Sequence, residues 1–298
     1  MKSTIAVAAL AGLSAAAPTQ KRASAPTDAD ILQYALTLEH LEDNFYKQGL
    51  ANYTEADFAA AGYDSTFYNN IKTVASDEAA HVDFLTKGLT AAGASPVKAC
   101  TYAFGATDVK TFLATAAVLE GVGVSAYLGA AADIMSKTYL TAAGSILTVE
   151  ARHASYIRAG VKQSPFPQPF DDPLSLNEVY TLAAQFITSC PSDNPTLPVK
   201  AFPTLMASSN DATIKSGSTI MLSTPGYEVE AEGDAMIYGA FITVTGPVVA
   251  EATKVDGGFT VVVPEGINGQ SYVVLTGCKD AVTDETVAAG PAIVEITN

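Results

Sequence analysis

Two short patterns in the sequence place a carboxylate and an imidazole at helical spacing. The chain has three histidines, and two of them close the segments EAAH at 78–81 and EARH at 150–153. Residues three apart lie on one face of a helix, so Glu78 with His81, and Glu150 with His153, can each bind a single ion. The spacing predicts two helices that present the same pair of ligand types.

Two lone glutamates complete the pattern. Glu39 precedes Tyr46 by seven residues, and Glu120 precedes Tyr127 by seven, which is about two helical turns and again one face. Glu42 lies on nearly the same face as Glu39. We favour Glu39 as the ligand because of its spacing to Tyr46, and we place Glu42 beside the ligands. The two tyrosines either hydrogen-bond to ligand carboxylates or pack in the core.

Four carboxylates and two imidazoles, contributed one element per helix, are what a four-helix bundle needs to hold two metal ions in its core. Such oxygen and nitrogen ligands suit iron or manganese. Buried carboxylates that face one another without cations would be costly. The sequence therefore predicts two Fe or Mn ions, held by Glu39, Glu78, His81, Glu120, Glu150 and His153.

The elements that must position these residues fall into two kinds. An Ala- and Leu-rich pattern with Ser, Thr and Asp caps predicts helices over 28–50, 65–92, 108–136 and 139–161, and a shorter fifth over 175–189. The glycines of the third helix, Gly121, Gly123 and Gly129, are expected to permit close approach by neighbours. A Pro-rich linker follows over 191–203.

Residues 204–298 differ in composition from the helical part, with short β-branched runs at 219–222, 241–244, 259–263 and 272–275. Short strands at such spacing predict a small β-sandwich. We expect an α+β chain of two domains: a helical bundle over 28–190 and a sandwich over 204–298. A length of 298 residues agrees with two domains.

The charge balance excludes some partners. The chain has 16 Lys and Arg against 31 Asp and Glu, a net charge of −15. Nucleic acids and anionic membranes require clustered basic residues, so neither is expected as a partner. The sequence has no Gly-x-Ser-x-Gly elbow, which argues against a hydrolase.

The first 22 residues have the layout of a secretory signal peptide. Lys2 precedes an apolar run over 5–13 and small residues over 14–17, and the run is too short to span a membrane. The dibasic pair Lys21-Arg22 predicts a second processing site. We therefore expect a secreted, extracellular protein, with the cell wall as one destination.

Export permits a disulfide and a glycan. Three cysteines allow at most one intramolecular bridge, and we choose Cys100 with Cys190 because both flank helices of the same domain. The third is Cys278. Asn52 opens a glycosylation sequon with a permissive middle residue, in a segment predicted to be a loop.

Four segments resemble a known family: LEHLEDNFY at 38–46, SDEAAH at 76–81, VLEGVGVSAY at 118–127 and VEARH at 149–153. They are similar to the ferritin-like domain of secreted fungal stress-response proteins and plant desiccation-related proteins. The resemblance covers roughly 28–190. It implies that Glu39 and Glu120 are terminal carboxylates, that Glu78 and Glu150 bridge two ions, and that the two histidines cap one ion each.

Two classes of function agree with these patterns. In the first, the metal centre reacts with oxygen or peroxide, as a ferroxidase, an oxidase or a manganese-catalase-like enzyme. In the second, a non-catalytic secreted or cell-wall protein uses the bundle as a stress-protective scaffold. In either class the strand-rich half is a candidate for contact with the cell wall or for self-association.

Overall fold

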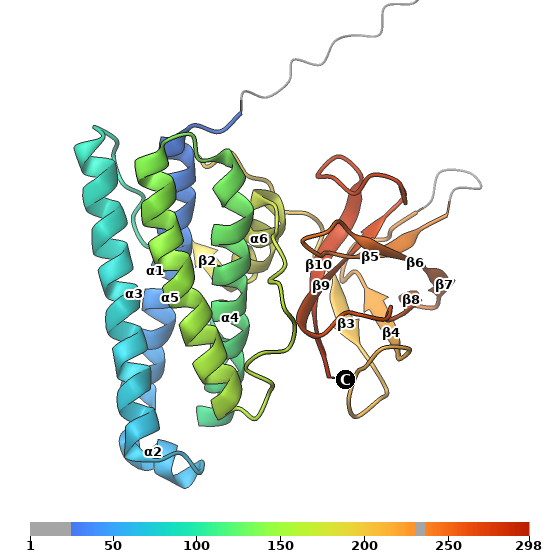
Figure 1. The fold of residues 1–298 in the computed structure, drawn as a ribbon, viewed down its shortest axis with the longest axis horizontal. Helices are drawn as coiled ribbons and strands as arrows, with labels where there is room; N and C mark the ends of the chain where they lie inside the picture. The colour runs from blue at the N-terminus through green and yellow to red at the C-terminus, as the bar shows by residue number, and fades with distance from the viewer. Residues whose placement is uncertain (1–24, 231–235, 298) are drawn as a thin grey trace, which may run out of the picture.

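The computed structural model describes residues 25–230 and 236–297. The predicted signal peptide and dibasic site, within 1–22, lie outside these residues. Figure 1 shows a helical half followed along the chain by a strand half. The linker runs between them, and hydrogen bonds hold it at both ends: Asn194 to the backbone of Lys98, and the Phe202 amide to Thr181.

Four long helices lie side by side in the helical half: α1 (Asp28–Asn52), α3 (Ser65–Ala91), α4 (Val109–Ala130) and α5 (Lys137–Gly160). Each begins at a residue whose side chain accepts a hydrogen bond from a backbone amide of the first turn, namely Thr27, Asp64, Asp108 and Ser136. These caps satisfy amides that have no partner inside the helix. The helix starts therefore follow from local chemistry.

The third predicted helix was too long. The segment 108–136 contains α4, which ends at Ala130, and a short 3₁₀ turn over Ala131–Asp133. The chain then leaves helical geometry, because the amides of Met135 and Ser136 both donate to the carboxylate of Asp28. Ser136 can thus cap the next helix.

The predicted fifth helix, 175–189, was also too long. It contains α6 (Leu176–Ala183), a 3₁₀ turn over Ala184–Phe186 and strand β2 (Ile187–Ser189). Strand β2 pairs with β1 (Thr101–Tyr102), so tertiary pairing overrides the helical pattern at these β-branched residues. Helix α2 (Glu55–Ala60) is only six residues long, and the sequence pattern does not predict it.

Within residues 204–230 and 236–297, the strand half contains two antiparallel sheets of four strands. One has the order β3 (Met206–Ser208), β4 (Thr219–Ser223), β8 (Gly258–Val262) and β7 (Thr253–Val255). The other has the order β10 (Val287–Ile296), β9 (Gly269–Thr276), β5 (Tyr238–Phe241) and β6 (Val248–Glu251). Inward side chains of both sheets, such as Leu222, Val261 and Leu275, share one hydrophobic core.

One predicted strand was misplaced. The run 241–244 contributes only Phe241 to β5, because a tight turn follows over 243–246. The Gly246 amide donates to the Thr243 carbonyl, and Gly246 has φ +103°, a conformation that favours glycine. The strand therefore ends earlier than its β-branched composition suggests.

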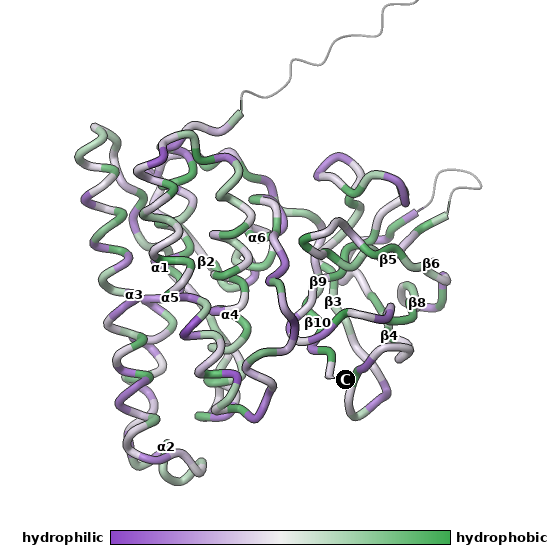
Figure 2. Tube along the Cα trace, in the orientation of Figure 1, coloured by the Kyte–Doolittle hydropathy of each residue, from purple (hydrophilic) through white to green (hydrophobic). Residues whose placement is uncertain are grey.

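Helix α4 is the central element of the molecule. Together with the turn after it, Val109–Asp133 is long and apolar enough to cross a membrane by length and composition alone, and Figure 2 shows its hydrophobic character. Most of it is buried inside the protein, against α1, α5 and α6, which is the environment of a core helix. Its apolar composition is explained by this packing.

The two halves share a polar junction beside α4. The Tyr272 hydroxyl, on β9, donates to the Gly121 carbonyl at 3.0 Å and accepts from Ser125 at 3.0 Å. Arg158 on α5 forms two hydrogen bonds with the carboxylate of Glu295 on β10, of 2.9 and 2.7 Å. The sheet of β9 and β10 is therefore fixed against the helices.

Candidate metal centre

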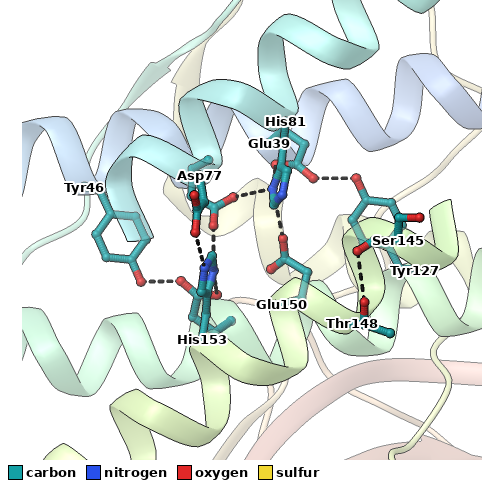
Figure 3. Close-up of polar contacts among 11 residues, drawn as sticks. Glu39, Tyr46, Asp77, His81, Tyr127, Ser145, Thr148, Glu150 and His153 are labelled. Carbon is teal, nitrogen blue, oxygen red and sulfur yellow. Dashed lines mark hydrogen bonds and ion pairs between the residues drawn. The ribbon is translucent and has the colours of Figure 1, made fainter. Parts of the chain in front are cut away.

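The six predicted ligand side chains converge between the four long helices. Helix α1 provides Glu39, α3 provides Glu78 and His81, α4 provides Glu120, and α5 provides Glu150 and His153. All four carboxylate residues are fully buried, and Figure 3 shows several of these side chains directed toward one another. Four buried acids at one level of the helices need compensation by positive charge.

One histidine approaches three of the carboxylates. The Nδ1 atom of His81 lies 3.2 Å from Glu39 Oε2, 3.1 Å from Glu78 Oε2 and 3.3 Å from Glu150 Oε1. These contacts join α1, α3 and α5 around a single imidazole nitrogen. The Glu-x-x-His spacing thus produces a local pair on α3 to which two other helices add ligands.

The second histidine has a similar environment. The Nδ1 atom of His153 lies 2.9 Å from Glu78 Oε1 and 3.3 Å from Glu120 Oε2. The two imidazole rings are 6.5 Å apart between centroids. Glu78 lies between them and contacts a different histidine with each of its oxygens.

These side chains form two overlapping groups that could each hold a metal ion. Within each group, one ligand atom from every member lies within 4.8 Å of the others. Both groups contain Glu78 and Glu150, which are therefore placed to serve two positions at once. The first group is completed by Glu39 and His81, and the second by Glu120 and His153.

Outer partners orient several of these ligands. The hydroxyl of Tyr46 donates to Glu120 Oε1, and that of Tyr127 donates to Glu39 Oε1. Both tyrosines are also buried, so each one packs in the core in addition to its hydrogen bond with a ligand carboxylate. Such outer hydrogen bonds fix ligand orientation in metal sites.

Asp77 is a further outer partner. Its Oδ2 lies 3.2 Å from Nε2 of His153, so the imidazole donates there and its Nδ1 faces the carboxylates. The sequence leaves two roles open for Asp77, next to Glu78: it orients a ligand, or it lies on a solvated helix face, which the pattern favours. The Asp77 carboxylate is 44% exposed, yet it contacts the buried histidine and so links α3 to α5.

Glu42 is a fifth buried carboxylate beside the cluster. It belongs to neither ligand group, whereas Glu39 belongs to one. Gly123 on α4 makes room for it: a Cβ at this glycine would lie 3.0 Å from Glu42 Oε1 and 2.7 Å from Glu150 Oε2. The glycine therefore permits close approach by two carboxylates.

The buried acids differ in their affinity for protons. Burial raises the pKa of Glu39 to about 7, and burial with mutual repulsion also raises the pKa of Glu42, Glu120 and Glu150. Burial acts in the same direction on Glu78, but the two histidines outweigh it and lower its pKa to about 2. Glu78 is thus the most acidic member of the cluster.

The histidines respond in the opposite sense. Burial alone would lower the pKa of both, but contacts with the carboxylates outweigh it and raise the pKa of His81 to about 12 and that of His153 to about 11. In the absence of metal, two imidazolium ions therefore neutralise part of the acidic charge.

The donor set fits a metal ion. Six buried ligand atoms have no hydrogen-bond partner within the described residues: Glu39 Oε2, Glu78 Oε1, Glu120 Oε2, both oxygens of Glu150, and His153 Nδ1. Four of the carboxylate oxygens lie 2.9–3.3 Å from a histidine Nδ1, which is ion-pair distance. Buried polar atoms in native proteins normally have partners, and cations would supply them here.

A cleft of about 860 Å³ opens beside the cluster, at the His153 and Asp77 end. Helix α5 and the segment after it form much of the wall, and Gln270 and Tyr272 of β9 form the side contributed by the strand half. Asp171 and Asp172 line the same cleft, where burial raises the pKa of Asp172 to about 6. The cleft gives the buried cluster a polar, solvent-facing side.

The remaining predicted residues lie away from this centre. Cys100 and Cys190 form a disulfide, and Cys278 is free. Asn52 is exposed, but it is the last residue of α1 and not part of a loop, because the helix continues to the Tyr53 cap. The third histidine, His40, is half-buried and its Nε2 lies 3.1 Å from the Val97 carbonyl.

Comparison with known proteins agrees with this geometry. Residues 27–163 match the family model of the ferritin-like domain, and this stretch includes all six predicted ligands. Protein rds1 of Schizosaccharomyces pombe is 27% identical over 229 residues, which is 70% of this chain and 56% of rds1. The chain thus spans little more than half the length of this relative. Over residues 27–163, the helical half of the chain is thus similar to a ferritin-like domain.

Proposed function

We propose that the ferritin-like domain holds two iron or manganese ions and that this centre reacts with oxygen or peroxide. One observation carries the proposal: two groups of buried ligand atoms share Glu78 and Glu150, and most of these atoms have no hydrogen-bond partner among the described residues. Two shared carboxylates between two histidine-capped positions suit a pair of ions better than a single one.

In this proposal each ligand and outer residue has a separate role. Glu78 and Glu150 hold both ions, Glu39 with His81 completes one position, and Glu120 with His153 completes the other. Tyr127, Tyr46 and Asp77 orient the ligands that they contact. When bound, such ions supply one-electron redox chemistry toward oxygen species.

The polar cleft is the route that we propose for hydrated species such as metal ions and peroxide. It reaches Asp77 and His153 from the solvent side, and carboxylates line it. Charged and hydrogen-bonding species lose little solvation in such a cleft. This role would give the strand half a share in substrate access, because Gln270 and Tyr272 form part of the wall.

Elemental analysis of the purified mature chain tests the proposal. We expect close to two iron or manganese ions per chain, and loss of both in the double variant Glu78→Ala, His81→Ala. Glu55→Ala, at an exposed position on α2, is the matched control and should keep its metal. A folded wild-type chain that rejects both metals would contradict the proposal and leave the non-catalytic scaffold function.

We also propose that the chain is exported, on the basis of the signal-peptide pattern within 1–22. Amino-terminal sequencing of protein from culture medium should place the mature start after the signal peptide or after Arg22. Protein found only inside the cells, with an intact amino terminus, would contradict export.

A further inference from the structure

A cavity of about 60 Å³ lies inside the ferritin-like domain and has an apolar wall. All four long helices contribute to this wall. Its members include Ala35 of α1, Phe84 and Gly88 of α3, Ala126 and Tyr127 of α4, and Ala143 of α5.

The cavity lies directly beyond the ligand layer along the helices. Ala35 is one turn before Glu39 on α1, and Leu85, another wall residue, is one turn after His81 on α3. On α4 the wall residue is Tyr127, whose hydroxyl donates to Glu39 Oε1. The inner wall is therefore one hydrogen bond away from a proposed metal ligand.

The wall determines what the cavity can hold. Apolar walls offer no hydrogen bonds to water, and apolar protein cavities of this kind bind small apolar molecules such as xenon. Peroxide and metal ions would lose their solvation there without replacement. A volume of 60 Å³ accommodates a diatomic gas molecule.

The wall is also built to remain open toward the surface. Phe84 is 52% exposed, so it marks the outer end. A Cβ added at Gly88 would meet no atom within 4 Å, which shows free space at this part of the wall. Alanines at 35, 126 and 143 keep the interior unfilled where larger side chains would close it.

We propose that this cavity takes up dioxygen and delivers it to the Glu39 and Tyr127 end of the metal centre. The delivery role rests on the proposed function, whereas gas uptake does not. The centre would then have two approaches of opposite character, an apolar one for gas and the polar cleft at Asp77 for ions and peroxide.

Xenon binding, followed by ¹²⁹Xe NMR under pressure, tests the uptake. We expect the wild-type chain to bind xenon, and Ala143→Leu to lose this binding because leucine fills the cavity. Gly88→Leu is a second variant, expected to fold because leucine is the better helix former and meets open space. Ala91→Leu, at an exposed position of α3, should bind xenon like the wild type.

Stopped-flow measurements on the metal-loaded protein test the delivery. In the variants that lose xenon binding, the rate at which dioxygen oxidises the metal centre should fall about tenfold. The rate of oxidation by hydrogen peroxide and the metal content per chain should stay at wild-type values. Absence of xenon binding in the wild type would overturn the proposal, and so would an unchanged dioxygen rate in the filled variants. If the chain binds no metal, the proposed function and the delivery role are both wrong. The xenon measurement would still show whether the cavity takes up gas.

Discussion

Gly123 faces the carboxylate of Glu150 so closely that a Cβ at this glycine would lie 2.7 Å from Glu150 Oε2. The glycine is on α4 and the glutamate on α5, so the absence of a side chain on one helix makes room for a proposed bridging ligand on the next. Glu42 uses the same space. A glycine in mid-helix is thus required here by the site and not by a turn.

Gly123→Ala should therefore lower metal content, because the added methyl group displaces the Glu150 carboxylate. Gly144→Ala is the control: it adds the same group to α5, where nothing lies within 4 Å, and should stabilise the fold by about 0.5–1 kcal/mol. Metal analysis and thermal unfolding of both variants check this. Full metal content in Gly123→Ala would show that Glu150 does not need this space.

Asp77→Asn should weaken metal binding, by about 10- to 100-fold, because the carboxylate no longer orients the His153 ring through Nε2. Competition with a chelator measures the affinity. Asp83→Asn on the same helix is the matched control, since Asp83 is exposed and pairs only with Lys87 in the described contacts. Equal losses in the two variants would point to a general effect of charge.

Metal uptake should release protons and should weaken as the pH falls. Contacts with carboxylates raise the pKa of His81 to about 12 and that of His153 to about 11, and burial raises the pKa of Glu39 to about 7. At neutral pH these histidines carry protons that a metal ion must displace, and below about pH 7 Glu39 adds another. Calorimetric titration in buffers of different ionisation enthalpy measures the release. A binding enthalpy independent of the buffer would contradict the prediction.

The Arg158 and Glu295 pair should couple the two halves. The Arg158 guanidinium is nearly buried, and Arg158→Ala leaves the Glu295 carboxylate unpaired at the junction. This variant should lower the free energy of unfolding by about 2 kcal/mol. Lys254→Ala, which breaks an exposed pair with Glu228, should cost little. A double-mutant cycle with Glu295→Gln isolates the pair, and a coupling energy near zero would rule out its role.

The disulfide should contribute substantially to stability. Cys100 and Cys190 are 90 residues apart, and a bridge that closes a loop of this length contributes about 2–5 kcal/mol. Cys100→Ser with Cys190→Ser should lower the denaturation midpoint accordingly. Cys278→Ser changes the free thiol and serves as the control. Equal midpoints in the double variant and the wild type would contradict this prediction.

The sequence predicts the long helices well because their signals are local. Caps at Thr27 and Asp108, with a long apolar periodicity, place α1 and α4 at their observed starts. Elements that depend on distant partners were missed or misjudged. Strand β2 forms only because Thr101–Tyr102 lies beside it, and β10, with a Gly290-Pro291 break in its middle, depends on pairing with β9.

The same distinction applies to the site. The pairs at 78–81 and 150–153 follow from spacing along single helices, and the structure brings them together with Glu39 and Glu120. Spacing to Tyr46 favoured Glu39 over Glu42, but Tyr46 donates to Glu120 instead. Glu39 differs from Glu42 because it lies beside His81 of α3 in one of the ligand groups. Nor could spacing decide between the two roles open to Asp77, a ligand-orienting one and a solvated one, because its contact with His153 depends on how α3 lies against α5.

The bridge between Cys100 and Cys190 also determines what happens when the chain is cut. It closes a covalent ring that contains α4, α5 and α6, and with them Glu120, Glu150 and His153. Lys162 is exposed within this ring, just after α5, and offers a site to a trypsin-like protease. A single cut there leaves all six proposed ligands on the fragment before the cut, and the bridge keeps the fragment with α6 and the strand half covalently attached. Reduction after such a cut would remove this covalent link to the strand half, and the six ligands would still share one fragment.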